Sequence, residues 1–332
     1  MTNKSSLILK YFQKAGQLTT QDSNYQKTIT SLFKWLLDSD QYKDDRTTKL
    51  LELKTSITAQ IISHDTGIIA GIDEVSYLIP KFSSLIIKAG KRDGEKVENG
   101  QIIAEISGLS REILSLERTV LNLLQRMSGI ATETNKLIAL INLQPTTHNP
   151  QLYIAATRKT PWGLLDKKAV TIGGGLTHRL NLGDGILIKD NHLAVFKKEF
   201  GLNSIDMAVS YALEISLRGP TLPGRVGPHQ HNLIEIEVTT PDQAHIVLET
   251  FYKYSKLKNN NLAIMFDNFS PEQTRSTIRS LREKFDLNLV ILEASGGINE
   301  NNIRDWAKTG VDILSLGSLT HSSKTCNLSL EI

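Results

Sequence analysis

The chain has 332 residues, 40% of them hydrophobic and 22% charged, and its 38 Lys and Arg nearly balance its 35 Asp and Glu. At about 150 residues per domain this length predicts two globular domains, and the small net charge excludes a basic nucleic-acid-binding surface over the whole molecule. The single cysteine, Cys326, excludes an internal disulfide and a cysteine-based metal cage, and no apolar run is as long as a membrane span. We therefore expect a cytoplasmic protein with neither nucleic-acid nor membrane partners.

The pattern of apolar residues changes near residue 56, from a helical to a strand-like spacing. Before that point apolar residues recur at helical spacing, as at Ile29, Leu32, Phe33 and Leu36. Residues 57–107 instead contain short apolar runs such as AQIISH and QIIAEISG, separated by Gly and Asn turns, which predict strands. A strongly helical stretch then begins at Ser110 and is expected to bridge two domains, with Gly129 as a candidate break between two helices.

After residue 150 the pattern becomes an alternation of strands and helices. The strands are predicted at six short apolar runs: LYIAAT, GILIKD, LIEIEV, LAIMFD, LVILEA and DILSLG. Helical patterns separate the later runs, and such repeats predict a parallel sheet, either a β/α barrel or a doubly wound sheet. The Gly- and Pro-rich stretch 218–232 interrupts the rhythm and is predicted to be a surface loop. Its His229 and His231 have metal-like spacing, but no acidic or Cys neighbour supports a metal site.

Most of the unusual polar residues lie at or near the carboxyl end of a predicted strand. They are Arg158, Lys159, Lys189, Glu235, Glu237, Asp267, Ser295, Gly296, Gly297 and Ser318. In a β/α barrel this end carries the active site, and in an open α/β sheet it is also where ligands bind.

The charged members of this set suit a polyanionic ligand. Five cationic or potentially cationic residues, Arg158, Lys159, His178, Arg179 and Lys189, could hold carboxylates or phosphates. Any one of them alone would be an ordinary surface charge, but five together favour a site. Glu237 and Asp267 could bind a divalent cation through oxygen, or could instead pair with the same Arg and Lys residues.

Two glycine clusters could cradle a phosphate. Ser295-Gly296-Gly297 follows a predicted buried strand and, together with LGSL on the next strand, matches the late-strand phosphate site of barrels. Gly173-Gly174-Gly175 could be a second cradle or only a flexible connector.

Taken in order, the motifs resemble a known enzyme family. ERTVLNLLQRMSGIAT, TRKT, GGGLTHRLNL, LIKDNH, EIEV, DN, EASGGI and GVDILSLGSLTHS are similar to those of nicotinate-nucleotide pyrophosphorylase (carboxylating), also called quinolinate phosphoribosyltransferase. The resemblance runs from residue 117 to 322 and more weakly over most of the chain. It implies an N-terminal α/β sandwich over 1–117, an incomplete parallel β/α barrel over 118–322, and a tail, 323–332, that returns to the first domain.

The resemblance also implies the reaction and the roles of residues. A phosphoribosyl group would pass from phosphoribosyl pyrophosphate to quinolinate with loss of CO2, giving nicotinate mononucleotide and pyrophosphate for NAD biosynthesis. The residues implied around the two carboxylates of quinolinate are Arg118, Arg158, His178, Arg179 and Lys189. Lys159 would hold pyrophosphate, and Glu237 and Asp267 would face ribose and Mg²⁺, with Lys159, Lys189, Glu237 and Asp267 as the catalytic set. The residues implied on the side of the 5′-phosphate are Ser295, Gly296, Gly297, Gly317 and His321.

Two departures from the family pattern concern the loop after TRKT and Gly185. Pro161 to Leu165 replace a longer segment that usually carries an Arg, and Gly185 stands where a larger apolar residue is usual. Alternatives are a nicotinate phosphoribosyltransferase without decarboxylation, a molybdenum-transport-associated homologue, or, in another class, a non-catalytic phosphosugar-binding barrel. The resemblance further implies a homodimer, or a higher oligomer of dimers, whose active sites are shared, because Arg118 lies on the bridging helix away from every strand end.

Overall fold

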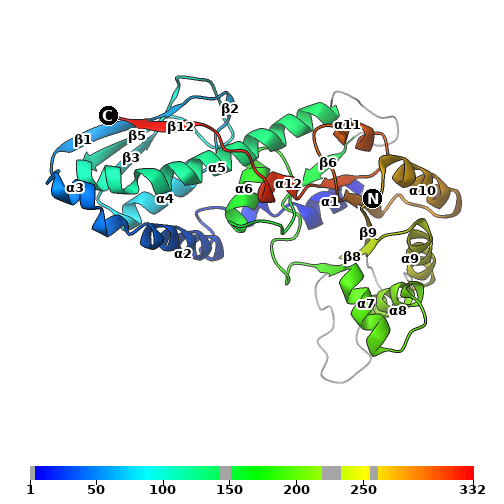
Figure 1. The fold of residues 1–332 in the computed structure, drawn as a ribbon. Helices are drawn as coiled ribbons and strands as arrows, with labels where there is room; N and C mark the ends of the chain where they lie inside the picture. Colours follow the sequence, from blue (N-terminus) through cyan, green and yellow to red (C-terminus); the bar gives the residue numbers. More distant parts are fainter. Residues whose placement is uncertain (1–3, 143–150, 219–232, 255–260) are drawn as a thin grey trace. The chain divides into compact units, whose positions relative to one another are not determined.

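The computed structural model describes residues 4–142, 151–218, 233–254 and 261–332 (Figure 1). Most of the predicted surface loop, with His229 and His231, lies outside these residues. The described chain forms two compact units. The barrel unit comprises Met1–Gln13, Ala139–Thr157 and His178–Leu316, and the sheet unit comprises Lys14–Ile138, Arg158–Thr177 and Gly317–Ile332.

The barrel unit is built on a six-stranded parallel sheet in the order β6-β11-β10-β9-β8-β7. Its strands are β6 (Tyr153–Ala155), β7 (Ile186–Ile188), β8 (Leu233–Val238), β9 (Asn261–Asp267), β10 (Val290–Ser295) and β11 (Ile313–Ser315). Five of them follow one another in chain order, and no pairing joins β6 to β7 in the described residues. The sheet is therefore an incomplete barrel of the predicted kind.

Helices connect successive strands, as parallel pairing requires. In this unit the connecting helices are α7 (Asp190–Glu199), α8 (Ile205–Arg218), α9 (Pro241–Tyr254), α10 (Pro271–Lys284) and α11 (Ile303–Trp306), and α1 (Lys4–Phe12) precedes the first strand. Every residue of β8 is buried, which explains why its sequence is a continuous rather than an alternating apolar run. The residues of one sheet face, such as Ile234, Ile236, Ile264 and Leu292, supply the apolar side of the core.

The sheet unit contains a four-stranded antiparallel sheet in the order β12-β1-β5-β3. Its strands are β1 (Ser56–Ser63), β3 (Ile86–Ala89), β5 (Ile102–Leu109) and β12 (Leu328–Glu331), and β2 (Gly67–Ile68) pairs separately with β4 (Lys96–Val97). Burial alternates along β1, with Ala59, Ile61 and Ser63 inside, as expected for a sheet covered on one face. Helices α4 (Ile72–Phe82) and α5 (Ser110–Asn142) run along the sheet (Figure 1).

The remaining helices of this unit are α2 (Ser23–Ser39), α3 (Arg46–Leu50), α4 (Ile72–Phe82), α5 (Ser110–Asn142, whose last residues belong to the barrel unit), α6 (Leu164–Ile172) and α12 (Ser318–His321), with short 3₁₀ turns at Ala15–Gln17 and Tyr42–Asp44. The C-terminal strand β12 pairs with β1, for example Leu330 with Ile61. The predicted fold class, an α/β sandwich with an incomplete barrel, is confirmed. The boundary at 117/118 stays a prediction.

The expected helix break at Gly129 is wrong. Helix α5 is continuous over 33 residues, and Gly129 lies in its middle. A Cβ at this position would lie 2.0 Å from the Lys324 carbonyl oxygen, so the glycine is there to let the C-terminal segment pass close to the helix. Gly173 has a similar role, because a Cβ there would lie 2.4 Å from the Ala131 carbonyl oxygen. The triple glycine thus ends α6 against α5.

Candidate active site

The chemistry-bearing side chains of the barrel unit share one face of the sheet. Register places Glu237 beside Met265 and Met265 beside Glu293, and it places Asp267 beside Ser295 and Ser295 beside Ser315. Because side chains alternate between faces along a strand, Glu235 and Glu237 point to the same side. We call this the acidic face, formed by Glu235, Glu237, Asp267, Glu293, Ser295 and Ser315. Its carboxyl-terminal edge holds Glu237, Asp267 and Ser295.

Lys189 and Glu237 form an ion pair at this edge. Lys189 directly follows β7 and begins α7, where its backbone N–H donates to His192 Nδ1 at 3.0 Å. Burial raises the pKa of the Glu237 carboxyl, the Lys189 ammonium opposes that effect, and the negative charge of Asp267 adds to it. The sequence therefore placed these three residues correctly near one another, and the ion-pair alternative for Glu237 is realised as well.

The turns at the carboxyl ends of β9 and β10 are hydrogen-bonded to each other. Asn268 donates from Nδ2 to Asp267 at 2.7 Å and from its backbone N–H to the Ser295 carbonyl at 2.9 Å. Gly296 has φ +97°, and a Cβ there would lie 2.3 Å from Asn268 Oδ1, so no other residue fits without rearrangement. Gly297 also has a positive φ, +65°. Two successive turns of this kind can present backbone N–H groups to an anion, as the predicted phosphate cradle requires.

Beneath the edge lies a buried cluster of His178, Glu235 and Glu293. Nε2 of His178 lies 3.4 Å from Glu235 Oε1 and 3.3 Å from Glu293 Oε1, and all three side chains are buried. Burial lowers the pKa of His178, but the two carboxylates outweigh burial and raise it. Glu293 was not predicted as a site residue, although its place two residues before Ser295 on the same strand was a usable signal.

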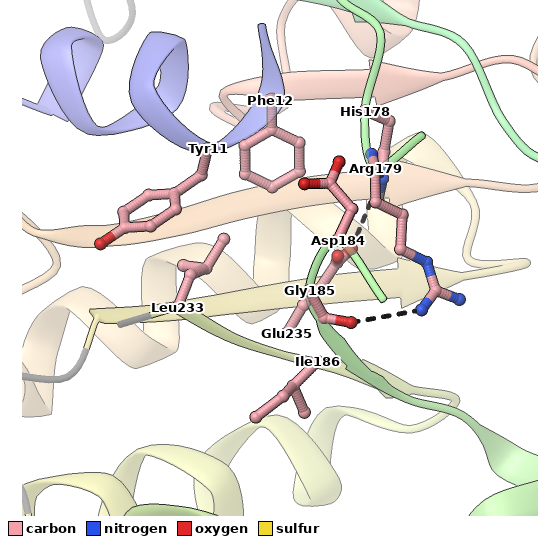
Figure 2. A pocket seen from close by; sticks show the side chains of 9 residues that line it. All are labelled: Tyr11, Phe12, His178, Arg179, Asp184, Gly185, Ile186, Leu233 and Glu235. Carbon is pink, nitrogen blue, oxygen red and sulfur yellow. Dashed lines mark hydrogen bonds and ion pairs between the residues drawn. The ribbon is translucent and has the colours of Figure 1, made fainter. Parts of the chain in front are cut away.

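His178 and Arg179 also line a small hollow of about 30 Å³ (Figure 2). Its lining residues are Tyr11, Phe12, His178, Arg179, Asp184, Gly185, Ile186, Leu233 and Glu235. The Arg179 guanidinium reaches the Gly185 carbonyl at 3.5 Å, and the Phe12 ring meets the His178 ring edge-on, 4.9 Å between centroids. A Cβ at Gly185 would meet no atom within 4 Å, so packing does not demand this glycine.

The sheet unit carries the other predicted residues, several of them close together. The Lys159 carbonyl accepts a hydrogen bond of 2.8 Å from Thr320 on α12. A Cβ at Gly317 would lie 3.0 Å from the His321 ring and 3.2 Å from Cδ of Lys159, so these three predicted residues meet. Arg158 precedes Lys159 on the same loop.

An ion-pair network anchors that loop, including its unusual segment from Pro161 to Leu165. Arg126 on α5 binds Asp166 through Nε and Nη2, at 2.7 and 2.8 Å, and Nη2 also donates to the Thr320 carbonyl at 2.7 Å. Thr160 donates to the same Asp166 carboxylate, and the Arg126 guanidinium lies 5.4 Å from the centre of the Trp162 ring. Trp162 and Asp166 therefore hold the shortened loop in place.

Arg118 lies apart from these residues, on α5. Its side chain is 60% exposed, and it borders a surface hollow of the sheet unit together with Leu36, Ser39 and Asp40. The predicted site residues of each unit are thus gathered within that unit, with Arg118 separate in the sheet unit.

Two groups of side chains differ in how well they could hold a metal ion. Glu237 and Asp267 offer hard carboxylate oxygens close enough to repel each other, which fits a divalent cation such as Mg²⁺. The His178 cluster fits less well, because His178 Nδ1 accepts a 2.7 Å hydrogen bond from the Arg179 N–H. That contact leaves Nε2 as the protonated nitrogen, and a protonated nitrogen cannot ligate a metal.

Comparison with known proteins decides the family. The C-terminal domain model of quinolinate phosphoribosyl transferase matches residues 130–331, and the N-terminal domain model matches residues 45–128. The chain belongs to the quinolinate phosphoribosyl transferase family. The predicted resemblance is confirmed.

Individual members of the quinolinate phosphoribosyl transferase family agree over nearly the whole chain. A probable nicotinate-nucleotide pyrophosphorylase [carboxylating] of Methanothermobacter thermautotrophicus is 36% identical over 88% of this chain and 94% of its own length. A probable enzyme of the same name from Bacillus subtilis is 35% identical over 87% of this chain and 88% of its own. The structure of the nicotinate-nucleotide pyrophosphorylase from Francisella tularensis, 31% identical, superposes with a TM-score of 0.72 over 92% of this chain and 96% of its own. Within the described residues no helix is long and apolar enough to span a membrane.

Proposed function

We propose that this protein transfers phosphoribose from phosphoribosyl pyrophosphate to quinolinate with decarboxylation. The products are nicotinate mononucleotide, pyrophosphate and CO2, on the route to NAD. The observation that carries the proposal is the carboxyl-terminal edge of the acidic face, where Lys189, Glu237, Asp267 and the Ser295 turn lie in a member of this family.

Carboxylates at this edge suit the chemistry of ribosyl transfer. As the bond between ribose and pyrophosphate lengthens, positive charge develops on the sugar. A fixed carboxylate beside the sugar stabilises that charge more in the transition state than in the ground state. Glu237 and Asp267 fill this role, and Lys189 is the cation that orients the Glu237 carboxylate. A barrel that merely bound a phosphosugar would gain nothing from two carboxylates beside an anion.

The cationic residues are assigned to the anionic parts of the substrates. Arg158, His178, Arg179 and Lys189, with Arg118, bind the carboxylates of quinolinate, since guanidinium groups bind carboxylates bidentately. Lys159 binds pyrophosphate, and the meeting of Lys159 with Gly317 and His321 supports a neighbouring phosphate subsite. Ser295, Gly296 and Gly297 supply the backbone N–H groups for the 5′-phosphate.

Mg²⁺ is the proposed cofactor, held by Glu237 and Asp267. When bound it neutralises charge on the departing pyrophosphate. Full turnover in the presence of a chelator would contradict this assignment.

We further propose a cytoplasmic homodimer, or an oligomer of such dimers, in which Arg118 completes the site of the partner subunit. The exposed position of Arg118 beside a surface hollow supports this arrangement. The small-molecule substrates are the only further partners proposed.

Parallel incubations test the proposed acceptor. The purified protein is given phosphoribosyl pyrophosphate and Mg²⁺ with either quinolinate or nicotinate, and nicotinate mononucleotide is quantified by chromatography. The proposal expects product from quinolinate. Product from nicotinate alone would identify the non-decarboxylating alternative, and tight binding of phosphoribosyl pyrophosphate without any product would identify the non-catalytic one.

A further inference from the structure

The buried cluster of His178, Glu235 and Glu293 lies one layer below the proposed reacting edge. Glu235 is two residues before Glu237 on β8, and Glu293 is two residues before Ser295 on β10, so both share the acidic face with the residues above them. His178 directly precedes Arg179, a proposed ligand of quinolinate. The cluster therefore links two buried residues of the sheet, Glu235 and Glu293, to the proposed quinolinate ligands His178 and Arg179.

Contacts surround the backbone N–H and both ring nitrogens of His178. Its backbone N–H donates to the Phe12 carbonyl at 3.0 Å, and its Nδ1 accepts from the Arg179 N–H at 2.7 Å. Its Nε2 faces the carboxylates of Glu235 and Glu293 (Figure 2 shows Phe12, His178, Arg179 and Glu235). The main chain of His178 therefore contacts α1, and its ring contacts β8, β10 and Arg179.

The backbone at His178 is strained. Its φ is +52°, in the left-handed region, which a residue with a side chain occupies at a cost unless surrounding contacts require it. The contacts just described supply that requirement. Arg179 is the next residue, so the backbone conformation of His178 determines the position and orientation of the Arg179 main chain.

The two carboxylates are costly to keep where they are. Neither oxygen of Glu293 accepts a hydrogen bond of regular geometry among the described residues, although Oε1 lies 3.3 Å from Nε2 of His178, and both Glu293 and Glu235 are buried. A well-packed apolar pair would fill this space at lower cost, because buried ionisable groups are expensive to desolvate. The carboxylates must therefore serve something other than stability, and the group that both of them face is Nε2 of His178.

We propose that Glu235 and Glu293 are positioning residues of the acceptor site, which fix the His178 ring as an Nε2–H donor and, through the His178 turn, fix Arg179. This inference rests on the proposed binding of quinolinate by His178 and Arg179. It assigns a role to two side chains that do not themselves touch substrate.

The first test is a spectroscopic one on the unmodified protein. Nitrogen chemical shifts of ¹⁵N-histidine-labelled protein, with His178 assigned by comparison with the His178→Gln variant, report which ring nitrogen carries the proton. We expect a proton on Nε2 of His178 in the intact protein, either alone or in the imidazolium form that the two carboxylates favour by raising the pKa of His178. Proton on Nδ1 alone, or metal bound to the purified protein at this ring, would overturn the inference whatever the acceptor substrate is.

The second test uses Glu235→Gln and Glu293→Gln, singly and together, with Glu74→Gln as the matched control. Glu74 is equally buried but belongs to the sheet unit, not to the barrel unit that holds His178, and it is not one of the proposed site residues. We expect the KM for quinolinate to rise about tenfold or more in the double variant, as expected for the loss of contacts to a charged group, with the KM for phosphoribosyl pyrophosphate unchanged. In the double variant the proton on Nε2 of His178 should no longer be fixed, and a form with the proton on Nδ1 alone should appear.

The outcomes separate this inference from the proposed function. If the intact protein turns over quinolinate and the double variant keeps both its quinolinate KM and its His178 signal, the positioning role is wrong while the function stands. If the intact protein does not use quinolinate, the proposed function is wrong, and the His178 signal in the variants still decides whether the two carboxylates fix the ring. A double variant that does not fold is replaced by Glu293→Gln alone, judged by the same two readings.

Discussion

Lys189 and Glu237 form an ion pair across β7 and β8, at the carboxyl-terminal edge of the parallel sheet. The lysine begins a helix and the glutamate lies in a fully buried strand, so both main chains are fixed by secondary structure. The pairing keeps a carboxylate beneath the place where the ribosyl cation is proposed to form. It also ties a proposed quinolinate ligand to a proposed catalytic group.

We predict that Glu237→Gln lowers turnover more than it weakens substrate binding, because the charge of Glu237 matters most as positive charge develops on the ribose. Asp267→Asn should act in the same direction. Steady-state kinetics with both substrates varied gives kcat and each KM, and Glu74→Gln serves as the control for a buried Glu-to-Gln change. A Glu237→Gln variant with normal kcat would contradict the electrostatic role.

Arg158→Ala and Arg179→Ala should weaken quinolinate binding far more than binding of phosphoribosyl pyrophosphate. Each removes a charge-assisted hydrogen bond to a carboxylate, which contributes about 1.5–3 kcal/mol. Titration calorimetry measures both affinities directly. Arg279→Ala, on the exposed side of α10, is the matched control and should change neither. Unchanged quinolinate affinity in both site variants would remove these arginines from the acceptor site.

Arg118 yields a prediction about assembly. If each site combines Lys189 of one subunit with Arg118 of the other, Arg118→Ala and Lys189→Ala are each nearly inactive alone, yet co-expression restores activity. Random pairing makes about half of the dimers mixed, and a mixed dimer has one intact site of two, so roughly a quarter of wild-type activity should return. Mixed dimers with no activity above the separate variants would return Arg118 to a structural role.

The sequence predicted the edge of the sheet better than its interior. Glu237, Asp267 and Ser295 could be placed together because each ends an apolar run, and parallel strands bring those ends to one edge. Glu293 could not, since its importance depends on His178 reaching it from a segment 115 residues earlier in the chain. The Gly129 prediction failed for a related reason. A glycine inside a helical pattern does not reveal whether it breaks the helix or admits a neighbouring chain, here the segment at Lys324.

Stability should fall as pH rises through neutrality because of a buried pair in the sheet unit. Tyr25 donates a 2.8 Å hydrogen bond to Glu74, and both are fully buried. Burial, reinforced by Asp93, raises the pKa of Glu74 from 4.5 to about 7, although the positive charge of Lys168 and the Tyr25 bond oppose this. The folded protein therefore binds more protons than the unfolded chain between these values. The stabilisation is complete below pH 4.5 and is lost as pH rises through 7.

Glu74→Gln should flatten this dependence. The difference in unfolding free energy between wild type and variant should change by at most about 3 kcal/mol from about pH 4 to about pH 8. Urea denaturation at several pH values measures it, and subtraction removes the contributions of other groups with raised pKa values, such as His178 and Asp93. A parallel pH dependence in wild type and variant would show that Glu74 titrates normally.

The acidic face of the barrel unit is proposed to carry out phosphoribosyl transfer coupled to decarboxylation. The most direct measurement is the release of labelled CO2 from quinolinate carrying ¹⁴C in its 2-carboxylate, followed together with nicotinate mononucleotide in the presence of Mg²⁺. We expect one CO2 for each nicotinate mononucleotide, no release without phosphoribosyl pyrophosphate, and strongly reduced release from Glu237→Gln. Release of CO2 without phosphoribosyl pyrophosphate, or no release from the wild-type protein with both substrates present, would contradict it.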